Sequence, residues 1–424
     1  MIRMSRRTFI VSGAATGGGL LIALLLPGCD RRSRNDKPPE AAVGSATSKD
    51  APHAPNLAPN AFIRIGRDGT VTFVMHKVEM GQGTFTSIPM LLAEELDVDP
   101  RKVLLEQAPP DNGRYADPLL GGQVTGGSTS VRGAWEPLRR AGATARAVLV
   151  QAAAQQWSVD PKDCQTADGA VKHVPTGRSL HYGELVDAAA TLGTPQNVPL
   201  RAVTDLRLVG KSMRRLDSAA KVNGQAKFGI DVRLPNMLVA TVAASPVIGG
   251  KLLGLDEAKA KAVPGVRQVL RLENAVAVVG DHLWAAKQGL AAAAPTWQDG
   301  DNASANFAQI VRDMEAASGK AGAVARNDGD AVAQLSTAKR RIEASYQMPF
   351  LAHATMEPMN CTIDLKADQC DVYVGTQVPV SAQSAVAKVT GLSPEKVRVH
   401  NHFLGGGFGR RLEVDFITQA AQFA

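Results

Sequence analysis

Cysteine is scarce in this sequence, with four residues among 424. None of Cys29, Cys164, Cys361 and Cys370 has the C-x₂-C or C-x₄-C-x₂-C spacing of an iron–sulfur or zinc site, so we expect no cluster within the chain. Cys361 and Cys370 flank an expected hairpin loop. A disulfide between them is conceivable in an oxidising compartment, but the turn would put the two residues out of register.

The sequence also lacks the common nucleotide-binding motifs and a strongly basic body. No Walker A motif is present, and no G-x-G-x-x-G lies in a βαβ unit with a later acidic residue. The net charge is +7, but residues 1–37 contain seven Lys or Arg and only two Asp. The remaining chain is therefore close to neutral, which excludes a nucleic-acid groove. The 45% apolar, 21% charged composition is that of a globular protein.

The first 29 residues resemble a twin-arginine export signal. Adjacent Arg6 and Arg7 precede Phe9, and an uncharged, weakly apolar run follows over residues 11–28. This predicts a folded, exported protein of the periplasm; a short membrane anchor is the alternative. Residues 26–29 resemble a lipoprotein cleavage box in which Pro27 is unusual, so lipidation of Cys29 stays open. Residues 30–60, rich in Pro, Ala, Ser and Asn, predict a disordered linker.

Two glycine-rich loops that lead into helices follow the first hairpin. Residues 61–75 alternate on either side of an Asp-Gly turn, which predicts the hairpin itself. The loop at residues 80–84 precedes a helical apolar spacing over residues 88–96. The loop at residues 118–130 precedes an Ala-rich helix over residues 131–156. A glycine-rich loop at a helix N-terminus is an anion site.

The rest of the chain divides into a small mixed domain over residues 213–300, a connector over 301–340 and a further β-rich unit over 341–424. The mixed domain contains expected strands at residues 226–232, 237–245, 265–272 and 276–279, around helices at 256–262 and 284–294. In the last unit we expect strands at residues 361–365, 371–375 and 397–399 and a helix at 380–390. Residues 405–409 (GGGFG) then form a loop almost free of Cβ atoms, whose amides can approach a bulky anionic ligand. His400 and His402 lack a nearby third ligand, so packing is favoured over metal binding.

Together these motifs resemble the molybdopterin-binding large subunit of the xanthine dehydrogenase and aldehyde oxidase family, of the isoquinoline 1-oxidoreductase β-subunit type. The resemblance is carried by residues 79–83 (EMGQG), 121–128 (GGQVTGGS), 221–231 (KVNGQAKFGID), 352–358 (AHATMEP), 375–377 (GTQ) and the GGGFG loop. It implies an α+β, multidomain molybdopterin-binding fold of the aldehyde oxidase type with an α/β hammerhead domain over residues 213–300. Residues 61–212 would be part of a permuted second molybdopterin-binding domain, and 341–424 a truncated first one.

The resemblance also implies a molybdopterin cofactor in the cytosine dinucleotide form, with no protein ligand to molybdenum. Gln377 matches a glutamine that hydrogen-bonds a molybdenum oxo ligand, Phe408 and Gly409 match residues whose backbone lies against the dithiolene, and Gln82 matches a glutamine near the cofactor. The implied cofactor-binding residues are Gly81, Gln82, Gly83, Thr84, Gly126, Gly127, Ser128, Thr129, Gln377, Gly406, Gly407, Phe408, Gly409 and Arg410. For Arg410 and Arg411, phosphate binding and a solvated surface are equally open. Leu412 stands where some relatives have a substrate-contacting glutamate.

The chemistry implied by the family is hydroxylation of aldehydes or N-heterocyclic aromatics with oxygen taken from water. Electrons would leave through a small [2Fe–2S] subunit to a cytochrome or a membrane acceptor. The family's general-base glutamate would lie beyond residue 424, and Glu79, Glu357 and Glu413 do not match it. We therefore expect the N-terminal portion of a large subunit. The alternative is a catalytically silent periplasmic lipoprotein that binds a cofactor or a partner.

Overall fold

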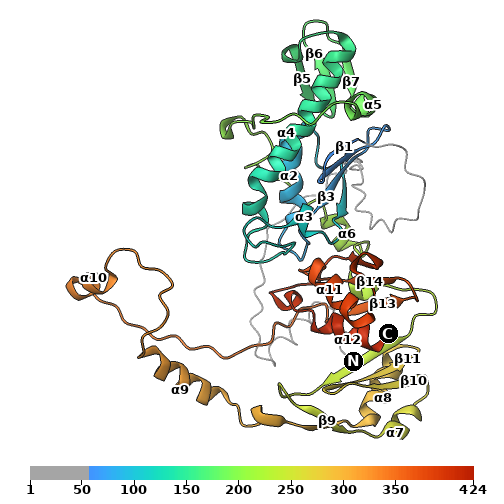
Figure 1. The fold of residues 1–424 in the computed structure, drawn as a ribbon, viewed down its shortest axis with the longest axis vertical. Coiled ribbons are helices and arrows are strands. Elements are labelled where there is room, and N and C mark those ends of the chain that lie inside the picture. The colour runs from blue at the N-terminus through green and yellow to red at the C-terminus, as the bar shows by residue number, and fades with distance from the viewer. Residues whose placement is uncertain (1–56) are drawn as a thin grey trace, which may run out of the picture. The chain divides into compact units, whose positions relative to one another are not determined.

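The computed structural model describes residues 57–424, in which helices and strands alternate (Figure 1). The export signal, Cys29 and most of the expected linker lie outside the described residues. Among those described, no helix has both the length and the apolarity needed to cross a membrane. The mixture of helices with several small sheets confirms the α+β class.

The first sheet has the order β1-β2-β3-β4 and contains the expected hairpin. β1 (Leu57–Asn60), β2 (Ile63–Ile65) and β3 (Val71–Met75) are antiparallel, and β4 (Leu104–Gln107) lies parallel to β3. The expected linker over residues 30–60 thus extends too far, because residues 57–60 form a strand that pairs with β2. Ile63, Ile65 and Phe73 are fully buried, as the alternation predicted.

Two helices pack together over this sheet. α2 (Thr84–Leu96) and α4 (Ser130–Trp157) lie side by side, and Ile88, Leu92 and Leu149 from their facing sides are buried in one core (Figure 1). Gly142 of α4 fits against the backbone of α2, because a Cβ there would lie 2.6 Å from the carbonyl oxygen of Leu92. Both helices begin at a glycine-rich loop, so this packing fixes the distance between the two loops.

Short polar strands follow, which the sequence pattern did not reveal. A three-stranded sheet, β5-β6-β7, contains β5 (Cys164–Ala167), β6 (Ala170–His173) and β7 (Ser179–His181). The short helices α5 (Val186–Ala190) and α6 (Ser218–Val222) separate these strands from the next unit, and another short helix, α3 (Asn112–Tyr115), lies between β4 and α4.

The mixed domain has one three-stranded and one two-stranded sheet. β8 (Val239–Ala244), β10 (Val266–Arg271) and β11 (Ala275–Gly280) form the order β10-β11-β8, and β9 (Lys251–Gly254) pairs with β12 (Thr296–Gln298). Helices α7 (Glu257–Lys261) and α8 (Leu283–Ala293) cover them. The strand expected at residues 226–232 was wrong: this segment turns into a 3₁₀ helix at Gly229–Asp231 and makes a single bridge from Phe228 to Phe403.

The last unit contains a βαβ arrangement. β13 (Cys361–Leu365) pairs antiparallel with β14 (Cys370–Val374), which is parallel to β15 (Val397–Asn401), and α11 (Pro379–Thr390) connects the two parallel strands. α12 (Asp415–Phe423) packs on α11. Cys361 is opposite Val374 and Cys370 opposite Leu365, so the two thiols are free. Before this unit lie α9 (Phe307–Ser318), α10 (Ala331–Thr337) and residues 338–355, which have no helix or strand.

Candidate functional site

The first glycine loop, residues 79–83, is organised around its own carboxylate. Glu79 is 1% exposed. Its Oε1 accepts hydrogen bonds from the amides of Gly81 (2.8 Å) and Gly83 (3.2 Å), and its Oε2 accepts one from the amide of Phe85 (3.0 Å). Gly81 and Gly83 have positive φ, 109° and 93°, which aims their amides inward. The expected anion site at this helix N-terminus is therefore occupied by Glu79 itself.

Two cations complete the surroundings of Glu79. Arg215 Nη2 lies 2.7 Å and Lys221 Nζ 3.2 Å from its Oε1, and both cations also pair with Asp217. Burial alone would raise the pKa of Glu79, but the amide of Phe85 and the charge of Lys221 lower it below the ordinary value. Glu79 is thus an ionised structural anchor that ties the loop to residues 215–221.

Gln82 folds back onto its own loop. Its Oε1 accepts from the amide of Met80 at 2.7 Å, and its Nε2 donates to the carbonyl of Val78 at 2.8 Å. The side chain is therefore occupied within the loop, and its contact with a cofactor stays a prediction. Of the loop's amides, those of Gln82 and Thr84 have no acceptor among the described residues.

A buried ion pair stabilises the second glycine loop. Lys77 Nζ lies 2.5 Å from Asp117 Oδ2 and donates to the carbonyl of Val124 at 2.6 Å; both side chains are almost completely buried. The Thr129 hydroxyl donates to the same carboxylate at 2.5 Å. In this loop the amides of residues 126–128 have no acceptor in the part of the chain that the structure describes.

His76 lies next to this ion pair and is kept neutral by its position. Its ring meets Phe62 edge to face at 5.4 Å, and its Nδ1 is buried without a hydrogen-bond partner. Burial, aided by the charge of Lys77, lowers the pKa of His76 to about 4. Protonation of His76 would therefore place a charge in a buried position beside Phe62 and Lys77.

Gln377 links the second loop to the last unit. It lies just before α11, where its Nε2 donates to the carbonyl of Thr125 at 2.7 Å and its own carbonyl accepts from the amide of Thr125 at 3.0 Å. The first bond orients the side-chain amide of Gln377, and the second, between backbone groups, holds Gln377 beside Thr125. The Oε1 of Gln377 is buried and has no hydrogen-bond partner, a condition that costs free energy unless a ligand group satisfies it.

The GGGFG loop is supported by a buried salt bridge. Arg411 is fully buried; its Nη2 lies 2.8 Å from Glu357 Oε2, and its other donors reach the carbonyls of Gly406 (2.9 Å) and Gly375 (3.1 Å). Glu357 also accepts from the amide of Gly405 at 2.8 Å. Arg411 is therefore neither a phosphate ligand nor part of a solvated surface, the two alternatives that the sequence left open.

The amides of residues 406–409 point away from this support and have no acceptor within the described residues. Phe408 takes the left-handed conformation (φ 51°) that is uncommon for a side chain of this size, and it is 68% exposed. Such strain occurs at ligand sites, where surrounding bonds maintain it. Here the Arg411–Glu357 pair supplies those bonds.

The first and last loops meet at Gly407, and Gln377 joins the second loop to them through Thr125. A Cβ at this position would lie 2.6 Å from Met80 Sδ of the first loop and 2.9 Å from Gln377 Oε1. The amide of Leu404 donates to the carbonyl of Glu79 at 3.0 Å, which joins the first loop to the last. Residues from all three sequence motifs thus come together around the unpartnered oxygen of Gln377.

The side chains of Arg410 and Thr129, two further predicted residues, also have partners. Arg410 forms a bidentate pair with Asp415 at 2.7 and 2.8 Å, and the Thr129 hydroxyl is bound by Asp117. Leu412 lies 3.8 Å from the position a Cβ of Gly126 would take, so it packs against the second loop. The cofactor roles of the predicted residues stay predictions.

Four residues that hold the loops were not assigned from the sequence: Lys77, Asp117, Glu357 and Arg411. The sequence does show charged residues close to the glycine-rich loops, which could have drawn attention to these four. It does not show which of the charged residues are buried. Glu79 and Glu357, to which no catalytic role was assigned from the sequence, both accept hydrogen bonds through their carboxylates.

His400 and His402, the other candidate pair, lie on and just after β15. His400 Nε2 lies 2.7 Å from Asp371, and its ring stacks on Tyr373 at 4.5 Å. Among the described residues, no group of three or more His, Cys, Asp or Glu side chains could hold a metal ion.

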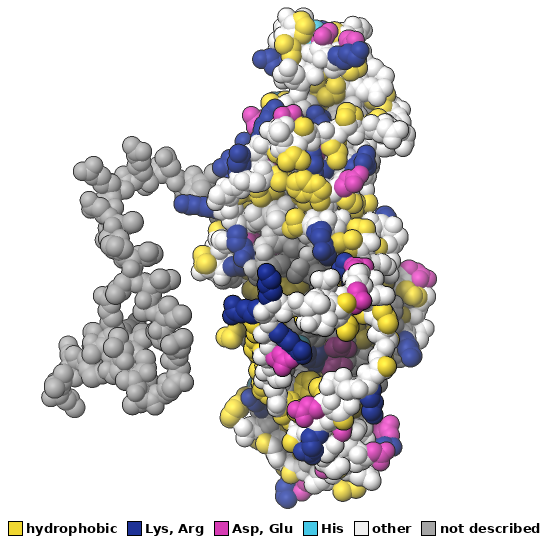
Figure 2. Space-filling model, turned by 90° about the vertical axis from the view of Figure 1, so that its left-hand side faces the viewer, with side chains coloured by type: hydrophobic (Ala, Val, Ile, Leu, Met, Phe, Trp, Pro, Cys, Tyr) yellow, Lys and Arg dark blue, Asp and Glu magenta, His cyan; other side chains and the backbone are white. Residues whose placement is uncertain are grey.

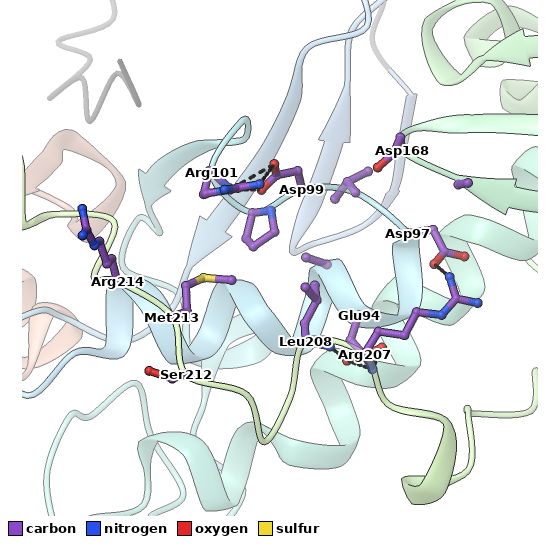
Figure 3. Close-up of a pocket in the computed structure, with 14 residues that line it drawn as sticks. Glu94, Asp97, Asp99, Arg101, Asp168, Arg207, Leu208, Ser212, Met213 and Arg214 are labelled. Atoms are coloured by element: carbon purple, nitrogen blue, oxygen red, sulfur yellow. Dashed lines mark hydrogen bonds and ion pairs between the residues drawn. The ribbon is translucent and has the colours of Figure 1, made fainter. Parts of the chain in front are cut away.

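A separate pocket of about 540 Å³ lies at the C-terminal end of α2 (Figure 3). Glu94 reaches the backbone amides of Arg207 and Leu208 there, while Asp99 pairs with Arg101. None of the predicted cofactor residues lines it. Its mixed charges already pair with one another, and it is distinct from the loops described above.

Similarity to known proteins places this geometry in a family. Models of a molybdopterin cofactor-binding domain match residues 31–230 and 316–424. The chain is 32% identical, over 99% of its length and 58% of the relative, to the beta subunit of isoquinoline 1-oxidoreductase from Brevundimonas diminuta. The chain belongs to the molybdopterin-binding subunits of the xanthine dehydrogenase family. This confirms the resemblance found in the sequence.

Further members of the family are similar to it. The membrane-bound aldehyde dehydrogenase (pyrroloquinoline-quinone) of Gluconacetobacter polyoxogenes is 28% identical over 99% of the chain and 53% of that protein. A nicotinate dehydrogenase subunit from Pseudomonas putida is 29% identical over 85% of the chain and 30% of that protein. The chain thus spans about half the length, or less, of these relatives.

The residues present fit a molybdopterin. The cofactor is anionic and has many hydrogen-bonding groups, and the loops around Gln377 offer unpaired amides at residues 126–128 and 406–409 together with one orphaned buried oxygen. The close packing at Gly407 excludes any side chain from this position. Backbone donors without Cβ atoms are the chemistry that such a ligand requires.

Proposed function

We propose that this chain supplies the molybdopterin-binding loops of a molybdenum hydroxylase large subunit, which oxidises aldehydes or N-heterocyclic aromatics with oxygen from water. The observation that carries the proposal is the convergence of three glycine loops on the buried, unpartnered Oε1 of Gln377. The names of the relatives, which include an isoquinoline oxidoreductase and an aldehyde dehydrogenase, support the substrate classes.

In this proposal the amides of residues 406–409 and 126–128 bind the cofactor's pterin and phosphate groups, in its cytosine dinucleotide form. Gln377 is held by Thr125, so its amide needs no reorientation when the cofactor binds. The exposed ring of Phe408 lies beside these amides and would shield the site from water. When bound, the molybdenum centre supplies the two-electron oxidation of the substrate.

In this proposal the proton acceptor is neither Glu79 nor Glu357, the two buried carboxylates beside the loops. Glu79 accepts hydrogen bonds from three amides and is paired with Arg215 and Lys221, and Glu357 is paired with Arg411. A general base needs a free lone pair facing the substrate. We propose that the base comes from a part of the family subunit outside residues 57–424.

Electron transfer also requires a partner in this proposal. Cys164, Cys361 and Cys370 are free thiols without cluster spacing, so a small [2Fe–2S] subunit would receive the electrons. A cytochrome or membrane acceptor would follow. The twin-arginine pattern at residues 5–10 supports export to the periplasm after the cofactor has been inserted.

Replacement of Gln377 tests the cofactor assignment. The full family subunit, produced in a host that makes molybdopterin cytosine dinucleotide, would be analysed for molybdenum and for released CMP. Gln377→Leu should reduce molybdenum content about tenfold, because it removes an oriented amide at the cofactor and unpairs Thr125. Gln383→Leu, which removes a similar bond from α11 to the Val397 carbonyl, should retain the cofactor.

The outcomes separate the alternatives. Metal-free wild-type protein would contradict the proposal, and equal retention by Gln377→Leu would exclude Gln377 from the site. Bound cofactor without turnover of aldehydes or N-heterocycles would favour the catalytically silent family member. CMP release distinguishes the dinucleotide from the simple pterin.

A further inference from the structure

Residues 341–350 have the pattern of a β-strand but no strand partner. Apolar side chains occupy the even positions (Ile342, Ala344, Tyr346, Met348 and Phe350), and the odd positions are Arg, Glu, Ser, Gln and Pro. Strict alternation over ten residues is typical of a strand with one face buried against a core. In the structure this segment has neither a strand assignment nor a backbone hydrogen bond.

The apolar face of this segment is exposed. Tyr346 is 88%, Met348 79% and Ile342 77% exposed. Contiguous exposed apolar residues of this size mark an interaction surface, whereas single ones do not. On the face shown in Figure 2, charged side chains of both signs are interspersed with apolar ones.

A neighbouring helix adds to the same apolar surface. α9 has Phe307, Ile310 and Met314 on one side, at the spacing of a helix face, and none of its residues is buried. Phe307 meets Phe350 edge to face at 6.0 Å, so helix and segment are already in contact. Met314 of α9 and the apolar residues Ile342, Tyr346 and Met348 of the segment nevertheless stay largely exposed.

This segment belongs to a folded domain in the family. The match to a molybdopterin cofactor-binding domain includes residues 316–424, and hence the whole exposed stretch. The relatives that match nearly the entire chain are also close to twice as long as the part matched, since the chain spans 58% and 53% of them. Polypeptide that could cover the segment is therefore part of the family subunit.

We infer that residues 341–350 form a β-strand that pairs with a strand from the portion of the family subunit that this chain does not span. The inference rests on exposure and family membership and does not require cofactor binding. Pairing should occur through one edge: amides of even and odd residues point to opposite edges, and Pro349 removes a donor from the odd edge. The even amides should therefore form the ladder.

Hydrogen exchange tests this pairing. The chain would be measured alone and after coproduction with the part of the Brevundimonas diminuta relative that lies outside the match. Alone, the amides of residues 341–350 should exchange without protection. In the complex, exchange at residues 342, 344, 346 and 348 should slow at least about tenfold. Protection of these amides in the chain alone would mean that the segment pairs within the chain. Absence of protection in the complex would mean that the added polypeptide does not pair with the segment. Either result overturns the inference.

A pair of matched double variants tests the apolar face. Tyr346→Asp with Met348→Asp should abolish copurification of the two polypeptides, because two charges would be buried in the interface. Ser345→Asp with Gln347→Asp adds the same charge to the opposite face, and the two polypeptides should still copurify. Since nothing in residues 57–424 covers this face, the first variant should leave the Tm of the chain alone within about 2 °C of wild type. A large Tm loss, or equal copurification of both variants, would overturn the inference.

Discussion

The first and last glycine loops look alike in sequence and differ in what their amides do. In the first, the amides of Gly81, Gly83 and Phe85 are bound by the buried carboxylate of Glu79. In the last loop, Gly405 is the residue whose amide donates to the carboxylate of Glu357, and the next four amides are left without an acceptor among the described residues. The last loop therefore has amides that could bind an anionic ligand, whereas the first loop supplies a carboxylate to its own amides.

The difference has a structural purpose. The first loop carries Met80 and the carbonyl of Glu79, both of which contact residues 404–407 of the last loop. A loop closed on its own carboxylate is rigid, and it can therefore position the open loop beside it. We interpret the first loop as support and the last loop as the binding surface.

Removal of the Glu79 carboxylate should have the largest effect. Glu79→Ala leaves three inward-facing amides without an acceptor and weakens the pairing of Arg215 and Lys221. We expect it to lower the free energy of unfolding by about 3–5 kcal/mol, measured by urea denaturation. Glu413→Ala, at an exposed carboxylate, is the control and should change it by less than about 0.5 kcal/mol. A loss under about 1 kcal/mol for Glu79→Ala would mean that the loop closes without its carboxylate.

Much of the framework around the loops could be predicted from the sequence. Alternation around an Asp-Gly turn predicted β2 and β3, and apolar periodicity predicted α2 and α4 to within a few residues. These signals are local, because the period of apolar residues reflects the face that each element buries. β5, β6 and β7 were missed because strands of three or four mostly polar residues have too few positions to show a period.

The sequence did not predict which loop binds its amides with its own carboxylate and which loop leaves them without an acceptor. Arg410 and Arg411 are adjacent and identical in type, yet the first is paired with Asp415 at the surface and the second is fully buried beneath the loop. Which of the two turns inward depends on the positive φ of Phe408 and Gly409. The closure of the first loop depends on Lys221 and Arg215, more than 130 residues away, which no local pattern indicates.

Protonation of His76 should lower the free energy of unfolding at a higher pH than protonation of Glu79 does. Its pKa is about 4 when folded and about 6.5 when unfolded, so between these values only the unfolded chain takes up the proton. The free energy of unfolding should therefore fall as the pH is lowered from 6.5 to 4, by about 3 kcal/mol in total. His76→Gln should flatten this dependence, whereas His181→Gln, at an exposed position, should not.

Glu79 contributes in a different pH range, which keeps the two effects separable. Its pKa is lowered in the folded chain, so its contribution is present above about pH 4.5 and is lost as the pH falls through the folded pKa. A wild-type protein whose stability stays constant between about pH 6.5 and about pH 5 would show that His76 is accessible to solvent or gains a proton acceptor.

A single methyl group at Gly407 should disturb the open loop with the smallest effect on stability. Gly407 has an ordinary φ, so Gly407→Ala acts only through contact of the new Cβ with Met80 Sδ and Gln377 Oε1. Met80 can move, but Gln377 is held by Thr125, so we expect a loss of about 1–3 kcal/mol in the free energy of unfolding. Gly322→Ala, where a Cβ meets nothing within 4 Å, is the matched control. Adding Met80→Ala should recover part of the loss if the first loop supports the last through this contact; no recovery would mean that the clash with Gln377 alone determines it.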